Sequence, residues 1–480
     1  MRMARTLFDK LWDAHLVRNL SSGEDGDGGT GLIAIDRILL HERTGGIALK
    51  ALEESGRDVR DPSRVFVTMD HVVDTLPGRG DRTIMPTGTD FILATREAAT
   101  RAGATLFDIG DPRQGIVHVI SPENAIVLPG LTLVCPDSHT CTQGALGALA
   151  WGIGSSEAEH ALATGTLRVN RPKQMRVTIS GDLAEGVTAK DLALYVVARL
   201  GSGGGRAHVI EYAGSTIEAL PIEARMTLCN MATELAAFTA VIAPDASTAA
   251  WLEGRTYAPR GEDWQAALAA WAQLSTDADA VFDREVAIDA ADVAPMVSWG
   301  TAPQQSAPLA GRVPRLAEPA ADAAPTTPEA HGRALVYMDL AEDTALLGLA
   351  IDAAFIGSCT NARLPDLRAA AGILAGRKVA AGVRAICVPG STRVKAEAEA
   401  EGLDKVFLAA GFEWREAGCS MCFFSGGESF GEEERVISTT NRNFESRQGP
   451  RTRTHLASPA TVAASAIAGR IADPRKLEAL

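Results

Sequence analysis

The sequence predicts a layered α/β protein in which parallel strands are covered by helices. Short runs rich in β-branched and aromatic residues, such as 65–68 and 131–135, alternate with Ala-rich runs of helical length, such as 91–102. This alternation is typical of parallel sheets. Hydrophobic residues make up 46% of the 480 residues and charged residues 22%, so the chain is expected to fold into several lobes.

The elements can be assigned in order from the N-terminus. Leu7, Leu11 and Leu16, with Phe8 and Trp12 beside them, recur at helical spacing and predict an amphipathic helix. A Gly- and Asp-rich loop at 25–31 follows. Strands are predicted at 32–35, 65–68, 116–120, 131–135, 175–179, 353–356, 385–388 and 436–438, and helices at 91–102 and 157–167.

A polar break at 170–172 and an Ala- and Pro-rich stretch from 302 divide the chain. They predict a first α/β lobe over 1–172, a second over 173–301, an extended connector over 302–335 and a third α/β lobe over 336–480. The connector is expected to lie outside the core because it is poor in large apolar residues.

Charge and hydropathy exclude several classes of protein. The net charge of −14 argues against nucleic-acid binding, which depends on clustered Lys and Arg. The chain has no run of about 18 apolar residues, so no segment is expected to span a bilayer. Asp9, Lys10 and Asp13 interrupt the region where a signal peptide would need an apolar core. A soluble cytoplasmic protein is expected.

Three of the seven cysteines have an informative spacing. Cys419 and Cys422 form a Cys-x-x-Cys pair, and Cys359 lies in a Gly-Ser-Cys-Thr-Asn turn about 60 positions earlier. Three thiolates favour zinc or an iron–sulfur cluster, and they leave one metal position open for a substrate. The alternative is that Cys359 is a core thiol and the pair is incidental. Cysteines 135, 141, 229 and 387 stand alone.

Three histidines lie in or directly after predicted strands. His71 follows Asp70, His118 falls within a strand, and His139 comes two residues after Asp137. A carboxylate fixes the tautomer of a histidine and raises its basicity, as general acid–base catalysis requires. Ordinary hydrogen-bonded histidines are the alternative. The other six histidines have no comparable context: 15, 41, 160, 208, 331 and 455.

A polar segment at 440–447 follows a predicted strand. Its Arg442 and Arg447, with Asn441 and Asn443 beside them, could bind a carboxylate, although a solvated loop would have a similar composition. The segment 152–157 is interpreted as a helix N-terminus, because Glu157 replaces the third glycine of a dinucleotide-binding motif. The glycine-rich stretch at 201–205 predicts a turn.

These segments, taken in order, resemble the aconitase superfamily, and within it the large subunits of bacterial 3-isopropylmalate dehydratases (isopropylmalate isomerases). The resemblance extends from Thr6 to Leu456. The matching motifs are Met69-Asp70-His71, Gln114-Gly115-Ile116-Val117-His118, Asp137-Ser138-His139-Thr140, Met226-Thr227-Leu228-Cys229-Asn230-Met231, Gly357-Ser358-Cys359-Thr360-Asn361, Gly418-Cys419-Ser420-Met421-Cys422 and Asn441-Arg442-Asn443-Phe444.

The resemblance implies three α/β/α lobes around an iron–sulfur cluster site, without the swivelling C-terminal domain of single-chain aconitases. It implies a [4Fe–4S] cluster held by Cys359, Cys419 and Cys422, whose open iron acts as a Lewis acid. It also implies three acid–histidine pairs and a set of substrate-site residues. The pairs are Asp70 with His71, Asp137 with His118, and Glu234 with His139. His71 would protonate the departing hydroxyl. The substrate-site residues are Ser138, Asn230, Asn441, Arg442 and Arg447.

The implied activity is that of a hydro-lyase of leucine biosynthesis. It would interconvert 2-isopropylmalate and 3-isopropylmalate by removing and re-adding water. Single-chain aconitases carry a further C-terminal domain with a catalytic serine and a substrate-binding arginine. The chain stops soon after the cluster motifs, so we expect a separate small subunit to supply that domain in a heterodimer or higher assembly.

Two departures from the isomerase pattern keep other substrates open. Isomerases usually read His-Glu-Val-Thr-Ser where this chain has His41-Glu42-Arg43-Thr44-Gly45, and Leu-Ala-Met-Asn where it has Phe423-Phe424-Ser425-Gly426. Another substituted malate, such as a methylmalate-, homoaconitate- or citrate-like compound, is therefore an alternative. An RNA-binding apo-protein is disfavoured by the acidic charge. A non-catalytic paralogue is disfavoured by the retained cysteines, acid–histidine pairs and arginines.

Overall fold

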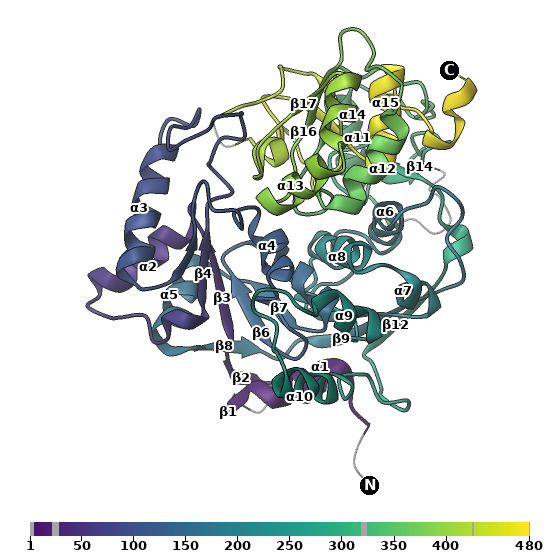
Figure 1. Ribbon diagram of the computed structural model, residues 1–480. Coiled ribbons are helices and arrows are strands. Elements are labelled where there is room, and N and C mark those ends of the chain that lie inside the picture. Colours follow the sequence, from purple (N-terminus) through teal and green to yellow (C-terminus); the bar gives the residue numbers. More distant parts are fainter. Residues whose placement is uncertain (1–3, 22–27, 318–323, 425–426, 480) are drawn as a thin grey trace.

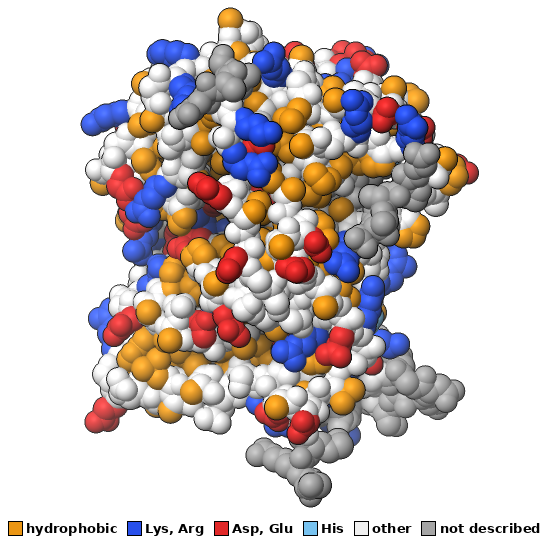
Figure 2. Space-filling model, turned by 90° about the vertical axis from the view of Figure 1, so that its right-hand side faces the viewer, with side chains coloured by type: hydrophobic (Ala, Val, Ile, Leu, Met, Phe, Trp, Pro, Cys, Tyr) orange, Lys and Arg blue, Asp and Glu red, His pale blue; other side chains and the backbone are white. Residues whose placement is uncertain are grey.

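Three parallel sheets form the framework of the protein in the computed structural model (Figure 1). The structure describes residues 4–21, 28–317, 324–424 and 427–479. Parts of the loop predicted at 25–31 and of the connector predicted at 302–335 lie outside the described residues, as do Ser425 and Gly426. No helix in these ranges is long and apolar enough to cross a membrane. On the face shown in Figure 2, acidic and basic side chains intermingle.

The first sheet has the strand order β5-β4-β3-β6-β7, and all its neighbours are parallel. Its strands are β3 (Arg37–His41), β4 (Val65–Thr68), β5 (Thr105–Phe107), β6 (Thr132–Cys135) and β7 (Leu149–Gly152). Its helices are α2 (Gly45–Glu54), α3 (Gly88–Arg101), α4 (Val117–Glu123) and α5 (Ser155–Thr164), with the 3₁₀ segments η1 (Pro62–Arg64) and η2 (Ser138–Leu146).

The second sheet has the order β11-β10-β9-β12 and is also parallel. Its strands are β9 (Lys173–Ser180), β10 (His208–Ala213), β11 (Thr239–Val241) and β12 (Arg284–Asp289). Helices α6 (Ala189–Leu200), α7 (Ser215–Ala219), α8 (Ile222–Asn230), α9 (Ala246–Leu252) and α10 (Glu262–Trp271) belong to this region, with η3 (Met231–Leu235) and η4 (Ala290–Asp292).

The third sheet has the order β17-β16-β15-β18-β19, again with all neighbours parallel. Its strands are β15 (Ala353–Ile356), β16 (Arg384–Cys387), β17 (Phe412–Trp414), β18 (Arg435–Ser438) and β19 (Arg453–Leu456). Its helices are α11 (Pro328–Met338), α12 (Leu364–Leu374), α13 (Thr392–Ala400), α14 (Leu403–Ala410) and α15 (Pro459–Ala468), with η5 (Ser420–Cys422) and η6 (Pro474–Ala479).

Two small antiparallel sheets and one helix complete the described fold. Helix α1 (Leu7–His15) begins at a capping box in which Thr6 accepts the Asp9 N–H and Asp9 accepts the Thr6 N–H. The small sheets are β1-β2-β8 and β13-β14. Their strands are β1 (Leu16–Ser21), β2 (Thr30–Ala34), β8 (Thr166–Asn170), β13 (Met296–Ser298) and β14 (Ser306–Pro308).

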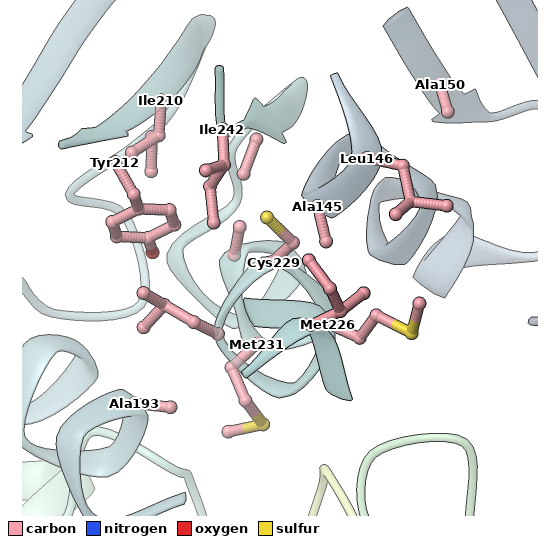
Figure 3. Close-up of a cluster of buried hydrophobic side chains, with 14 of the residues drawn as sticks. Ala145, Leu146, Ala150, Ala193, Ile210, Tyr212, Met226, Cys229, Met231 and Ile242 are labelled. Carbon is pink, nitrogen blue, oxygen red and sulfur yellow. The ribbon is translucent and has the colours of Figure 1, made fainter. Parts of the chain in front are cut away.

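A shared hydrophobic core joins the first two sheets (Figure 3). Ala145 and Leu146 of η2 pack in one cluster with Met226 and Cys229 of α8 and with Tyr212 of β10. The core fixes the position of α8, whose last residue is Asn230. Each parallel sheet falls within one of the predicted lobes, and the exact lobe boundaries stay predictions.

The three parallel sheets repeat one strand order. Numbered within each lobe, the first strand lies centrally, the second and third lie on one side, and the fourth lies on the other. Successive strands are therefore added first on one side of the central strand and then on the other. This change of side falls between β3 and β6 in the first lobe and between β15 and β18 in the third. Loops at the carboxyl ends of the strands on either side of such a point form a crevice that commonly binds ligands.

Most predicted elements are confirmed, one is wrong and one is wrong in part. The predicted strand at 116–120 is helix α4, so His118 lies on a helix; its apolar residues are buried on all sides, which removes the helical periodicity from the sequence. The helix predicted at 157–167 ends at Thr164, because Gly165 adopts a left-handed conformation and the chain enters β8. The region predicted as a connector contains β14 and the start of α11. The expectation that it lies outside the core is wrong, because its Leu309 and Val313 are buried in the hydrophobic core of the third lobe.

Candidate functional site

The loops at two of these crevices face one another and carry most of the predicted site residues. In the first lobe, Asp70-His71 follows β4 and Asp137-Ser138-His139 follows β6. In the third lobe, Cys359 follows β15 and Asn441-Arg442 follows β18. The Cys419 N–H donates to the Asp70 carbonyl oxygen at 2.8 Å, which joins the two lobes beside the predicted cluster.

His71 lies between two carboxylates. Its Nδ1 is 2.6 Å from Asp70 Oδ1 and its Nε2 is 3.1 Å from Asp137 Oδ2. Burial alone would lower the pKa of His71, but Asp70, Cys419 and Asp137 raise it well above 6.5. Burial likewise opposes ionisation of Asp70, yet His71 holds the pKa of that carboxyl below its usual value. The two carboxylates therefore favour the protonated form of this imidazole.

Asp137 also contacts the second predicted histidine. Its Oδ1 lies 2.8 Å from His118 Nε2, so one carboxylate serves His118 and His71 together. Despite burial, the charges and hydrogen bonds of these two histidines hold the pKa of Asp137 well below its usual range. The predicted pairing of Asp137 with His118 is thus present in the structure as a contact, and it is shared with His71.

The third predicted pair also lies beside Asp137, whose Oδ1 is 3.8 Å from His139 Nδ1. His139 Nε2 is 3.1 Å from Glu234 Oε1, and Arg442 Nε donates to the same oxygen at 2.7 Å. Burial and the Arg442 charge lower the pKa of His139 to about 4, so this imidazole is neutral. Ser138 Oγ lies 3.3 Å from His139 Nδ1. The surroundings of His71 and His139 therefore shift the pKa values of these two histidines in opposite directions.

The three predicted cluster ligands are all buried, and polar groups surround their sulfur atoms. Asn230 Nδ2 and Asn441 Nδ2 lie 3.1 and 3.5 Å from Cys359 Sγ. Arg447 Nη2 lies 3.7 Å from Cys422 Sγ, and Cys419 Sγ is 3.9 Å from His71 Nδ1. All five predicted substrate-site residues thus lie at or near the cysteines and histidines.

Three buried cysteine sulfurs, with amide and guanidinium donors beside them, are a soft ligand set of the kind that binds zinc or an iron–sulfur cluster. Burial and the neighbouring Cys422 raise the pKa of Cys359 to about 12, so a bound metal centre is needed to keep the thiolate form.

Sequence reasoning missed His41 and Glu42. The His41 ring stacks on the His71 ring at a centroid distance of 3.8 Å. The buried Glu42 carboxylate accepts the N–H groups of Asp70 at 3.0 Å and Val72 at 2.6 Å. The interpretation of His41 as a histidine without context is therefore wrong. The available signal was its position at the end of β3, the central strand of the first sheet.

Lys190 of α6 was also missed. Its buried ammonium donates to the Thr439 and Thr440 carbonyl oxygens, each at 2.7 Å, directly before Asn441 and Arg442. Burial lowers the pKa of Lys190 to about 7. Nothing local in the sequence distinguishes this lysine from a surface lysine, because its partners are about 250 positions away.

The two departures from the isomerase pattern contact each other. The Arg43 guanidinium lies over the Phe423 ring, with 4.9 Å between Cζ and the ring centroid, and Arg447 lies 5.4 Å from the same centroid. The Phe423 and His71 rings are 5.7 Å apart. Arg43 Nη1 is buried without a hydrogen-bond partner among the described residues. The two departures from the isomerase pattern, Arg43 and Phe423, therefore lie together beside His71.

The chain belongs to the aconitase family (aconitate hydratase), which it matches over residues 9–469. This match confirms the predicted family and its α/β fold class. The 3-isopropylmalate dehydratase large subunit 1 of Bradyrhizobium diazoefficiens is 50% identical over 474 residues, covering 99% of this chain and 97% of that protein. Among solved structures, aconitase X of Thermococcus kodakaraensis in its holo-form is similar, with a TM-score of 0.44, 14% identity, and coverage of 86% and 84% of the two chains.

Proposed function

We propose that the chain is the large subunit of a hydro-lyase that interconverts 2-isopropylmalate and 3-isopropylmalate in leucine biosynthesis. The observation that carries this proposal is His71 held between the Asp70 and Asp137 carboxylates beside three buried cysteines, in a chain half identical to a 3-isopropylmalate dehydratase large subunit. An acid, a metal-ligand set and carboxylate-binding groups are what reversible dehydration of a substituted malate requires.

Cys359, Cys419 and Cys422 would hold a [4Fe–4S] cluster. When bound, such a cluster supplies an open iron that polarises the substrate carboxylate and hydroxyl as a Lewis acid. The amide groups of Asn230 and Asn441 donate toward the Cys359 sulfur and would stabilise its thiolate charge.

The side chains around this position have separable roles in the proposed reaction. Arg447 and Arg442 bind and orient the substrate carboxylates, because a guanidinium matches a carboxylate with two parallel hydrogen bonds. His71 holds the proton for the departing hydroxyl on Nε2, where Asp137 shares it at 3.1 Å. Glu234 contacts both His139 and Arg442, so it would hold these two side chains in place.

A small subunit is proposed as the partner that completes the site. The expected experiment compares the cluster-loaded chain with and without candidate small subunits, using 2-isopropylmalate. We expect little or no turnover by the chain alone and restored turnover with a cognate partner. Robust turnover by the isolated chain, or none with any partner under conditions in which the cluster is intact, would contradict the proposal.

Arg43 favours a second candidate substrate class, a malate with a polar or anionic side group. Its unpartnered Nη1 lies where isomerases usually carry valine, and an additional carboxylate on the substrate would satisfy it. The test compares kcat/KM for 2-isopropylmalate and for a citrate-like tricarboxylate in the assembled enzyme. If the tricarboxylate is preferred and Arg43→Val reverses the preference, the second class is correct. A preference for 2-isopropylmalate that Arg43→Val leaves unchanged would exclude it.

A further inference from the structure

Ser358 has an unusual backbone conformation directly before the predicted cluster ligand Cys359. Its φ angle is 81°, the largest positive value of any non-glycine residue in the ranges that the structure describes. Residues other than glycine are strained in this left-handed region, because their Cβ atom approaches the following carbonyl oxygen. Such strain persists only where the surrounding contacts hold it, and it is concentrated at functional sites.

The turn around Ser358 is held on both sides. Thr439 Oγ1 accepts the Gly357 N–H and donates to the Gly357 carbonyl oxygen, each at 2.9 Å. On the other side of Ser358, Thr360 Oγ1 donates to Asn230 Oδ1 at 3.0 Å. These hydrogen bonds keep the backbone in its left-handed form. Glycine would therefore adopt the backbone conformation of position 358 at the lowest cost.

The Ser358 side chain has a contact that glycine could not make. The residue is fully buried, and its Oγ lies 3.2 Å from Cys422 Sγ. Arg447 Nη2 and Asn441 Oδ1 lie farther from this sulfur, at 3.7 and 4.0 Å. The contact with Cys422 is also the only hydrogen bond of the Ser358 hydroxyl among the described residues. The serine side chain is therefore directed at one predicted ligand while its backbone precedes another.

The direction of this hydrogen bond depends on whether Cys422 ligates a metal. A protonated thiol donates to Ser358 Oγ, as in the structure. A cysteine that ligates a metal has lost its proton, so its sulfur can only accept. The Ser358 hydroxyl can then donate, because a hydroxyl group rotates to direct its hydrogen toward an acceptor. Hydrogen bonds to the sulfurs are among the features that set the reduction potential of an iron–sulfur cluster.

Ser420 provides a comparison within the same site. It lies between Cys419 and Met421, and its φ angle is also positive, at 47°. Its Oγ accepts from Thr75 Oγ1 at 2.9 Å, and no sulfur is its hydrogen-bond partner among the described residues. A left-handed serine beside a cluster ligand therefore does not by itself contact a sulfur. The contact with Cys422 distinguishes Ser358 from Ser420.

We propose that Ser358 is a positioning residue for Cys422, whose ligating thiolate accepts a hydrogen bond from the Ser358 hydroxyl. This inference rests on the cluster of the proposed function. The hydrogen bond stabilises the negative charge on the sulfur, so it raises the reduction potential of the bound cluster and strengthens iron binding. It also joins the Cys359 turn to the Cys419–Cys422 pair, since the two residues are 64 positions apart.

The first measurement is the reduction potential of the reconstituted cluster in the full chain, followed under anaerobic conditions by electron paramagnetic resonance. The reduced cluster carries one more negative charge than the oxidised cluster, so loss of a donor should lower the potential in Ser358→Ala. Ser420→Ala is the matched control. It removes a hydroxyl from the other left-handed serine beside a ligand, but it removes no donor to a sulfur, so the potential should stay at the wild-type value.

The second measurement is the resistance of the bound iron to a chelator in the absence of oxygen. In Ser358→Ala, the chelator concentration that removes half of the iron should fall about tenfold, because loss of a group that bonds a metal ligand commonly weakens metal binding to this degree. In Ser420→Ala this concentration should not change. If Ser358→Ala does not fold, Ser358→Gly removes the same hydroxyl from a residue that tolerates the φ angle, and the same two shifts are expected.

The outcomes separate this inference from the proposed function. A wild-type cluster whose potential and iron retention are unchanged in Ser358→Ala or Ser358→Gly would overturn the role of Ser358 and leave the cluster intact. Changes of the same size in Ser420→Ala would also overturn it, because they would show that any substitution beside a ligand has this effect. Wild-type protein that binds no iron and sulfide after reconstitution would refute the cluster itself, and the role of Ser358 with it.

Discussion

At the scale of single residues, Lys190 controls the loop that carries Asn441 and Arg442. Its two hydrogen bonds to the Thr439 and Thr440 carbonyl oxygens are fully buried. Lys190→Met should lower the free energy of unfolding by about 2 kcal/mol, because two buried carbonyl groups lose their donor. Urea unfolding measures this change.

The matched control is Lys378→Met. Lys378 also donates to a backbone carbonyl oxygen, that of Ala409, but the contact is exposed. The control should therefore change stability by less than about 0.5 kcal/mol. Lys190→Arg, which keeps the donors, should retain more iron than Lys190→Met. Equal stability of the wild type and Lys190→Met would show that the Arg442 loop is held by other contacts.

His455 makes stability depend on pH far from the candidate site. Its Nδ1 donates to the Ser298 carbonyl oxygen at 2.6 Å and its Nε2 accepts from Arg435 at 2.9 Å, so no position is left for a second proton. Burial and the Arg435 charge lower its pKa to about 3. The unfolded chain takes up that proton below about pH 6.5, so this contribution to stability is complete above pH 6.5 and declines as the pH falls toward 3.

Replacing His455 by Gln removes this proton uptake and keeps a donor and an acceptor. Between pH 6.5 and 5 the wild type should lose about 1.6 kcal/mol more than His455→Gln, because the slope rises from about 0.7 kcal/mol per pH unit at pH 6.5 toward about 1.4. Urea unfolding at several pH values measures the difference. Parallel pH profiles for the two proteins would rule out His455 as the cause.

At the scale of elements, helix α4 is positioned by a backbone contact with the third lobe. Gly115 bridges Ser391, and the Ile116 N–H donates to the Gly390 carbonyl oxygen at 2.8 Å. A Cβ at Gly115 would lie 2.5 Å from Ser391 Cα and 2.7 Å from the Gly390 oxygen. Gly115→Ala should therefore destabilise the protein by about 1–3 kcal/mol and move His118 away from Asp137.

Gly372, on the exposed face of α12, is the control for this substitution. A Cβ there meets nothing within 4 Å. Gly372→Ala should stabilise the protein by about 0.5–1 kcal/mol, because glycine loses more backbone entropy than alanine in a helix. Thermal unfolding of both variants gives the comparison. Similar effects of the two changes would mean that the bridge between lobes does not position α4.

At the scale of the whole molecule, the proposed cluster would tie the third lobe to the first. Cys419 already contacts Asp70 through its backbone and His71 through its sulfur. Anaerobically purified protein should contain about four irons and four sulfides per chain, and Cys422→Ser should lose them. Cys387→Ala, which removes a buried cysteine within β16, should keep them.

Removing the cluster by chelation should lower the thermal unfolding midpoint by about 5–10 °C, because a group that binds only the folded state stabilises it. The same chelation should leave the midpoint of Cys422→Ser unchanged. Zinc in place of iron and sulfide, or no metal after reconstitution, would contradict the cluster and remove the Lewis acid from the proposed reaction.

Much of the site could be predicted because motifs are local. Asp70-His71, Asp137-Ser138-His139 and the three cysteines stand in short segments at strand ends, and the resemblance added partners such as Glu234. His41, Glu42 and Lys190 could not be found in this way, since their importance depends on which residues face them. The strand predicted at 116–120 failed because a segment buried on every side has no periodicity.

The sequence by itself determined the α/β class, the family and many of the residues that could carry chemistry, because each of these depends on composition, spacing or short motifs. Only the tertiary structure decided that the three sheets repeat one strand order and that two of the resulting crevices face each other. It alone showed that Asp137 contacts two histidines and that Arg43 contacts Phe423. These contacts join residues tens to hundreds of positions apart, and such distances are fixed by packing of the whole chain.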